Sequence, residues 1–225
     1  MDFSQIDVAR GILWYLVFLF STTCHEAAHA WSALRLGDPT AYEGGQMTLH
    51  PWPHVRREPF GMVLVPILSF ILGGWMIGWA SAPYDPAWAL RHPKRNALMS
   101  LAGPVANFVL ALLAGFTLRF LLTSGLLVPS GAEGMATFGD GVLNLLAIAF
   151  TLNVLLGTFN LIPFPPLDGS GVIQLLMGEN LARRWQSLLH EMPMLGFAGL
   201  LLAWKLSGPV LTFVMGWASL LVMGS

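Results

Sequence analysis

The residues with the clearest capacity for chemistry lie at 23–30, which read Thr-Cys-His-Glu-Ala-Ala-His-Ala. They contain the pattern His-Glu-x-x-His, in which His25 and His29 are four positions apart. On an α-helix this spacing places both imidazoles on one face, one turn apart. Two such imidazoles can hold one Zn²⁺, and the carboxylate of Glu26 between them can act as general base on a metal-bound water.

The setting of this motif is unusual, because apolar runs lie on both sides of it. Residues 12–20 read Ile-Leu-Trp-Tyr-Leu-Val-Phe-Leu-Phe, and residues 30–36 are again mostly apolar. A His-Glu-His cluster within a helix of membrane length is costly unless it performs a function. The alternative interpretation is that the two histidines are buried and hydrogen-bonded for structural reasons alone.

The composition of the chain is that of a protein integral to the lipid bilayer. Of its 225 residues, 55% are hydrophobic and only 10% are charged, whereas soluble domains carry about 25% charged residues. Mean hydropathy is +0.65. The net charge of -1 and the lack of a basic run give no sign of nucleic-acid binding. Cys24 is the single cysteine, which excludes an intramolecular disulfide.

The distribution of apolar segments predicts an all-α polytopic membrane protein. We expect a bundle of about 4–6 transmembrane or re-entrant helices in one domain over residues 1–225, with a small extended segment after the first helix. The expected helices lie at about 8–36, 97–122 and 141–162, and are followed by amphipathic and apolar segments over 171–223. The first helix should end at Gly37-Asp38-Pro39, where a C-cap glycine precedes a proline.

The segments between these helices contain turn residues and interruptions. Polar or broken stretches are expected at 37–59, 81–97 and 205–209. Within the first of them, residues 46–50 have the pattern of a short strand. The apolar stretch 60–80 contains Pro66 and the pair Gly73-Gly74. These residues allow either a kinked span or a re-entrant pair of half-helices.

A second motif ends the helix expected at 141–162. Residues 160–169 read Asn-Leu-Ile-Pro-Phe-Pro-Pro-Leu-Asp-Gly, and three prolines in four residues cannot continue a helix. The chain must therefore become extended at membrane depth, which requires protein or a water-filled cavity around it. Asp168 is a candidate for the third protein ligand that a zinc hydrolase needs. Alternatively, it caps the helix expected over 169–177.

Together, these motifs resemble those of the site-2 protease family of intramembrane zinc metalloproteases. The matching segments are His-Glu-Ala-Ala-His at 25–29, Ala-Gly-Pro-Val-Ala-Asn at 102–107 and Asn-x-x-Pro-x-x-Pro-Leu-Asp-Gly at 160–169. Their order and separation are similar to those of short bacterial and archaeal members, and the resemblance covers nearly the whole chain.

The resemblance implies one Zn²⁺ held by three side chains, a catalytic carboxylate beside it and two supporting amides. The implied zinc ligands are His25, His29 and Asp168, the catalytic carboxylate is Glu26, and the supporting side chains are Asn107 and Asn160. Asn160 would contact the backbone of the substrate. In this mechanism Glu26 takes a proton from the zinc-bound water as that water attacks a peptide carbonyl.

Two segments depart from the pattern of the family. His50 stands where relatives often carry asparagine, and Arg57-Glu58-Pro59 stands where they often carry Asp-Pro. His50 and His54 are therefore candidates for additional metal contacts, although solvated loop histidines are the more common case. We expect no PDZ or CBS domain of the kind that larger members carry, and regulation that comes from a membrane partner.

The expected function is hydrolysis of a peptide bond within or near a transmembrane helix of a single-pass membrane protein, as in regulated intramembrane proteolysis. Such a substrate must be presented as an extended backbone, because a helix holds its carbonyl groups in hydrogen bonds. One alternative is a metal-ion transporter, which would use the same ligands but has no need for Glu26 between the histidines. Another is a catalytically silent relative that only binds membrane helices.

Basic residues predict the orientation of the chain in what we expect to be a prokaryotic cell membrane, because they favour the cytoplasmic side. Three loops hold most of them, at Arg35, Arg56 and Arg57; at Arg91, Lys94 and Arg95; and at Arg183 and Arg184. Residues 124–140 hold none. With all three basic loops inside, 60–80 must re-enter. The zinc then lies in the cytoplasmic half of the bilayer, because His29 is only about 9 Å along the helix axis from the first basic loop.

Cysteine-accessibility labelling in a Cys24→Ser background tests this orientation. We expect Ser130→Cys to react with an impermeant reagent from outside the cell, and Ser81→Cys to react from the cytoplasm. The predicted orientation is wrong if Ser130→Cys is labelled only from the cytoplasm, or if Ser81→Cys is labelled only from outside.

Overall fold

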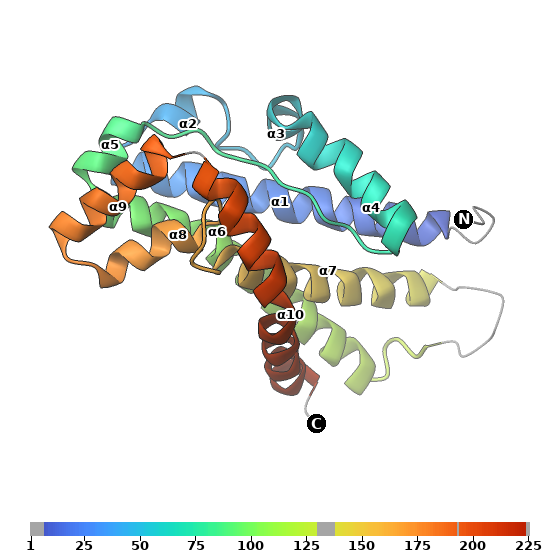
Figure 1. Cartoon of the computed structure of the whole chain (residues 1–225). Coiled ribbons are helices and arrows are strands. Elements are labelled where there is room, and N and C mark those ends of the chain that lie inside the picture. The colour runs from blue at the N-terminus through green and yellow to red at the C-terminus, as the bar shows by residue number, and fades with distance from the viewer. Residues whose placement is uncertain (1–6, 130–137, 193, 224–225) are drawn as a thin grey trace.

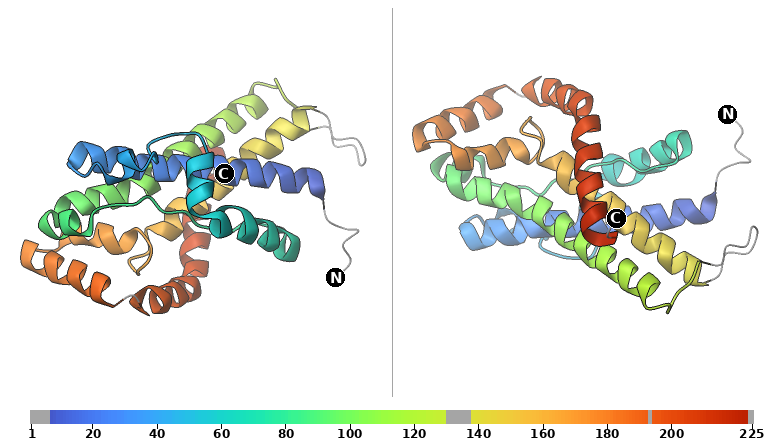
Figure 2. Two further views of the ribbon diagram at one scale, coloured as in Figure 1. Left: turned by 90° about the horizontal axis from the view of Figure 1, so that it is seen from above. Right: turned by 90° about the horizontal axis from the view of Figure 1, so that it is seen from below.

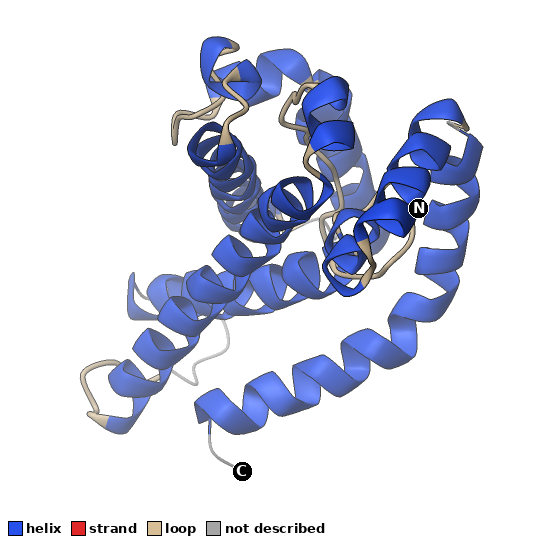
Figure 3. Ribbon diagram, turned by 90° about the vertical axis from the view of Figure 1, so that its left-hand side faces the viewer, coloured by secondary structure: helices blue, strands red, loops and turns tan. Residues whose placement is uncertain are grey.

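The computed structural model describes residues 7–129, 138–192 and 194–223, so the labelling position Ser130 lies outside the described residues. Within these ranges all regular structure is helical, and Figure 3 shows no strand. Four of the described helices are long and apolar enough to cross a membrane: α1 (Val8–Leu36), α6 (Pro93–Thr123), α7 (Phe138–Asn160) and α10 (Met194–Met223). The prediction of an all-α polytopic membrane protein is confirmed.

Helix α1 has a well-defined cap at each end. The side chain of Asp7 accepts a hydrogen bond from the backbone N–H of Arg10, and the helix ends at Gly37, whose φ of 104° suits glycine. Asp38 follows and is buried. Its carboxylate accepts from the backbone N–H of Asp85 at 2.9 Å, so it ties the end of α1 to a segment much later in the chain.

The long helices pack around α1, α6 and α7. Helix α6 contacts both α1 and α7 along much of its length, and α10 crosses α7 and α6, as the view from below in Figure 2 shows. Phe18 and Leu152 belong to the apolar cluster between α1 and α7. Ala111, Phe150 and Val222 belong to the cluster that joins α6, α7 and α10. These contacts hold the middle of α1 against two neighbouring helices.

The loop after α1 contains two short helices instead of a strand. They are α2 (Thr40–Glu43) and α3 (Trp52–Arg57). The strand predicted at 46–50 is wrong, because these residues form bends and no neighbouring strand pairs with them in the described chain. Side chains close the loop instead. Gln46 Nε2 donates to the carbonyl of Pro53 at 3.2 Å, and His54 Nε2 lies 3.0 Å from the carbonyl of Thr48.

The apolar stretch 60–80 doubles back on itself. It consists of a π-helix, η2 (Phe60–Leu64), which continues into α4 (Val65–Gly73) and is followed by a non-helical segment. Gly74, with φ of 73°, ends α4. The returning chain is tied to the helix, since Trp79 N–H donates to the Gly61 carbonyl at 3.1 Å. Figure 1 shows α4 and the returning segment on one side of α1. Of the two readings left open by the sequence, this geometry is that of the re-entrant pair, with an extended chain as its second limb.

The remaining described elements are α5 (Pro86–Arg91), α8 (Gly169–Val172), a 3₁₀ helix η3 (Ile173–Leu176) and α9 (Glu179–Glu191). Helix α5 lies inside the expected polar loop, where the side chain of Asp85 caps it by accepting from Ala87 N–H at 2.8 Å. The break predicted at 205–209 is wrong, because α10 continues through Pro209. Pro209 removes only one hydrogen bond from the helix, whereas unwinding the chain there would remove several.

Candidate metal centre

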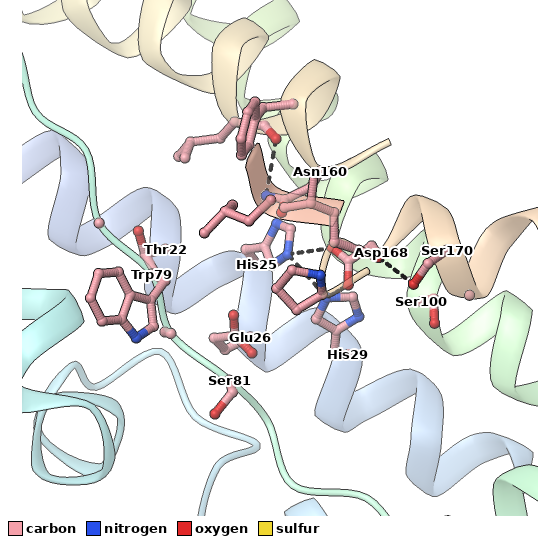
Figure 4. Close-up of a pocket in the computed structure, with 18 of the residues that line it drawn as sticks. Thr22, His25, Glu26, His29, Trp79, Ser81, Ser100, Asn160, Asp168 and Ser170 are labelled. Carbon is pink, nitrogen blue, oxygen red and sulfur yellow. Dashed lines mark hydrogen bonds and ion pairs between the residues drawn. The ribbon is translucent and has the colours of Figure 1, made fainter. Parts of the chain in front are cut away.

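The central part of α1 carries the three side chains of the His-Glu-x-x-His motif. His25, Glu26 and His29 are all buried, where α1 meets α6 and α7. Asp168 comes from the turn between α7 and α8. Figure 4 shows the two imidazoles and the Asp168 carboxylate turned toward one another, with Glu26 to one side.

The potential ligand atoms of three side chains converge on one point. His25 Nε2 lies 3.0 Å from Asp168 Oδ2, and His29 Nε2 lies 3.3 Å from Asp168 Oδ1. The two Nε2 atoms are 3.0 Å apart. All three residues offer ligand atoms within 4.8 Å of one another. They form the one group of at least three His, Cys, Asp or Glu side chains with this geometry in the described part of the chain.

The other nitrogen of each imidazole faces an oxygen. His25 Nδ1 lies 2.5 Å from Asn107 Oδ1, and His29 Nδ1 lies 2.7 Å from the backbone carbonyl of Met99. Each oxygen can only accept, so each Nδ1 carries a proton, and in the neutral form of each imidazole Nε2 then presents a lone pair. In that form two imidazole lone pairs and a carboxylate face one another, which is an arrangement that suits a cation between them.

This donor set fits zinc. Zn²⁺ binds imidazole nitrogen and carboxylate oxygen, and catalytic sites use three protein ligands and leave the fourth position open. Ligating histidines typically donate their other N–H to a carbonyl or carboxylate, as both histidines do here. The prediction of a zinc cofactor is supported by this geometry.

Glycine residues allow the close approach of the elements around the centre. A Cβ atom at Gly103 of α6 would overlap Nε2 of both His25 and His29. A Cβ atom at Gly169 would overlap the backbone carbonyls of Leu161 and Ile162, so the turn that carries Asp168 folds tightly only with glycine there. The close contacts therefore explain why glycine stands at 103 in the motif 102–107 and at 169 in the motif 160–169.

Asp168 occupies the N-cap position of α8, but its side chain makes no capping hydrogen bond. The carboxylate points instead to the two imidazoles. Helix α7 ends at Asn160, and the prolines that follow force a non-helical segment, as predicted. The prediction that this segment is extended is wrong, because hydrogen bonds such as that from Leu167 N–H to the Phe164 carbonyl at 3.0 Å fold it into turns. Of the two interpretations of Asp168, the geometry matches the ligand and not the cap.

Glu26 and the ligands share one large cavity. Its volume is about 1120 Å³, and its walls include Thr22, the non-helical segment 75–84 and Trp204 of α10. The Glu26 carboxylate makes no hydrogen bond within the described residues, and Figure 4 shows it near the returning chain at Ser81. Glu26 is therefore free to exchange a proton with a molecule in the cavity.

The other predicted residues divide into two groups. Asn107 is fully buried and contacts His25 directly. Asn160 lines the cavity, but its Nδ2 donates to the Leu156 carbonyl at 3.1 Å and not to a ligand. Its role toward substrate stays a prediction.

His50 and His54 do not join the centre. His54 is buried and contacts the Thr48 carbonyl. Nδ1 of His50 accepts from the backbone N–H of Trp52 at 3.2 Å.

Sequence reasoning missed two contributors to the site. The Met99 carbonyl that faces His29 could not be found, because every residue has a carbonyl. Asn153 of α7, which contacts Asn107 at 2.9 Å, was also missed. Asn153 is the only amide side chain in the mostly apolar run 145–156, and this was a signal that could have found it.

The fold and the centre together define a polytopic membrane protein with a buried His₂Asp site of the zinc-hydrolase type. Residues 13–203 match the sequence profile of peptidase family M50. The chain therefore belongs to this family, which is the site-2 protease family that the motifs resemble.

Several relatives are named as candidate zinc metalloproteases. YwhC of Bacillus subtilis is 39% identical over 163 residues, which cover 71% of this chain and 68% of YwhC. Rip2 of Mycolicibacterium smegmatis is 33% identical, over 70% of this chain and 54% of Rip2. MJ0611 of Methanocaldococcus jannaschii is 30% identical, over 55% of this chain and 56% of MJ0611. The chain thus spans only about half the length of the last two. No solved structure matches the chain significantly.

We expect Gly103→Ala to weaken zinc binding, because its methyl group must displace both imidazoles. Overpacking of this kind costs about 1–3 kcal/mol, so zinc affinity should fall by about one to two orders of magnitude. A matched control is Gly216→Ala in α10, where a Cβ atom meets open space away from the cavity. Competition with a chromogenic chelator measures both affinities. Unchanged affinity in Gly103→Ala would contradict the close approach of α6.

Proposed function

We propose that the protein is an intramembrane zinc metalloprotease that hydrolyses a peptide bond within or near a transmembrane helix of a single-pass membrane protein. The observation that carries this proposal is the position of Glu26. Its carboxylate lies beside the His25–His29–Asp168 centre, faces the same cavity and makes no hydrogen bond to the described residues. A site that only held a metal would have no use for a buried carboxylate that makes no hydrogen bond.

The residues of the chain have distinct tasks in this reaction. His25, His29 and Asp168 hold the metal. When bound, zinc acidifies a water molecule and polarises a peptide carbonyl. Glu26 accepts the proton of that water and returns it to the amine that leaves as the peptide bond breaks. The buried position of Glu26 keeps bulk water away from this proton transfer.

The walls of the cavity favour a substrate with an extended backbone. The backbone groups of residues 80–82 make no hydrogen bond within the described chain, although they line the cavity together with Glu26. An extended peptide could pair with them, whereas a helix keeps its own backbone groups occupied. The substrate is therefore a membrane helix that unwinds near the cleaved bond.

The proposed location is a prokaryotic cell membrane, with the site toward the cytoplasmic half of the bilayer. The relatives from bacteria and an archaeon support the first part, and the clustering of basic residues in three loops supports the second. Regulation by a membrane partner is part of the same proposal. A metal-ion transporter would explain the three ligands, but it would leave Glu26 without a task.

Glu26→Gln tests the catalytic step. The amide keeps the shape of the side chain but cannot take a proton from water, so cleavage should fall by about 10²–10⁴-fold while zinc stays bound. The measurement is zinc content together with cleavage of a panel of membrane-spanning peptides by the purified protein in detergent. Normal cleavage by the variant would refute the assignment, and loss of zinc would make Glu26 a ligand.

Asp168→Ala tests the third ligand. We expect zinc occupancy to fall about as far as in His25→Ala, because both variants remove one of three ligand atoms. His50→Ala and His54→Ala are the matched controls, since both histidines lie in the loop after α1 and contact only loop residues. Full zinc content in Asp168→Ala combined with loss of zinc in His50→Ala would mean that His50, and not Asp168, is the third ligand.

A further inference from the structure

Asn153 of α7 is a buried polar side chain to which the proposed reaction gives no task. It is 1% exposed, and all of its polar atoms have partners. Its Nδ2 donates to Ser21 Oγ and to the Ala149 carbonyl, both at 2.8 Å. Its Oδ1 accepts from Asn107 Nδ2 at 2.9 Å. Asn107 in turn reaches His25, so one chain of side chains connects three helices to the metal centre.

This series of hydrogen bonds has a fixed donor-to-acceptor direction, which is set by the backbone carbonyl of Ala149. The Ala149 carbonyl can only accept, so the amide nitrogen of Asn153 must face it and the oxygen must face Asn107. The nitrogen of Asn107 is then used by Asn153, and its oxygen must face His25 Nδ1. An oxygen at that place requires a proton on Nδ1, which leaves the lone pair of Nε2 for the metal.

We propose that Asn153 is a positioning residue that fixes the tautomer of His25 through Asn107, and so keeps His25 competent as a ligand. This inference rests on the zinc site of the proposed function. Without Asn153, Asn107 is free to rotate its amide by 180° and to offer N–H to Nδ1. His25 would then carry its proton on Nε2, directed at the place of the metal.

We call the hydrogen bonds from Asn153 through Asn107 to His25 the relay. His29 shows why only one of the two histidine ligands needs it. Its Nδ1 faces the backbone carbonyl of Met99 at 2.7 Å. A backbone carbonyl cannot be exchanged for a donor by rotating a side chain, so the tautomer of His29 is fixed without help. His25 depends on an amide side chain, which has a donor and an acceptor of nearly the same shape. The second amide removes that ambiguity.

Asn153→Leu tests the relay in the purified full chain. The leucine has a similar volume and leaves Nδ2 of Asn107 without an acceptor. Zinc affinity, measured by competition with a chromogenic chelator, should fall by about 10–100-fold, as is typical when a partner of a metal-ligating histidine is lost. The matched control is Thr158→Val on the same helix, which removes a buried hydroxyl that has no partner and should leave zinc affinity unchanged.

A second variant separates orientation from packing. In Asn107→Asp combined with Asn153→Leu, the side chain at 107 presents an acceptor to His25 Nδ1 whichever oxygen faces it. The relay is then unnecessary, and zinc affinity should rise above that of Asn153→Leu and return toward that of the unaltered protein, although the packing change at 153 is still present. Both variants carry the same packing change at 153. A difference in zinc affinity between them therefore reports the orientation of the side chain at 107.

The outcomes are distinct from those that test the protease. Unchanged zinc affinity in Asn153→Leu overturns the relay, and so does a double variant that fails to recover zinc. Neither result touches the proposed cleavage reaction. Conversely, a chain that binds zinc with the expected pattern of variants but cleaves no membrane peptide would refute the protease and leave the relay standing. An unaltered chain without zinc affinity would overturn both.

Discussion

The structure is organised around three side chains whose potential metal-binding atoms lie within 4.8 Å of one another in an apolar bundle. Such a group is unfavourable unless a cation neutralises it, so every surrounding element must compensate for it. The imidazoles are held from behind by Asn107 and by the Met99 carbonyl, and Gly103 gives them room. The apolar contacts of α1, α6 and α7 hold these groups in place.

Two non-helical segments lie beside this centre, and their positions explain one another. The turn 161–168 delivers Asp168, and the returning segment 75–84 faces Glu26 across the same cavity. Both would be forbidden in contact with lipid, because their backbone groups are not paired within a helix. The cavity beside the centre is also what permits the chain to be non-helical there.

The elements set by local sequence were predicted well, and those set by partners were not. Helix α1 has the predicted bounds, since an apolar run and a C-cap glycine act within a few residues. The strand at 46–50 failed because a strand needs a neighbour, and side chains of Gln46 and His54 close the loop instead. The break at 205–209 failed because the cost of breaking a helix depends on its surroundings. The choice between a span and a re-entrant pair at 60–80 depended on contacts such as Trp79 with Gly61.

By itself, the sequence determined the chemistry of the site. The spacing of His25, Glu26 and His29 is a property of one helix, and the prolines before Asp168 act on their own neighbours, so both could be deduced without a fold. Only the tertiary structure decided that Asp168 contacts His25, which is 143 positions away in the sequence. It also decided that Asn153 accepts a hydrogen bond from Asn107. The orientation of an amide and the tautomer of an imidazole depend on which atoms lie opposite them. Helix packing places those atoms, and no local pattern in the chain records it.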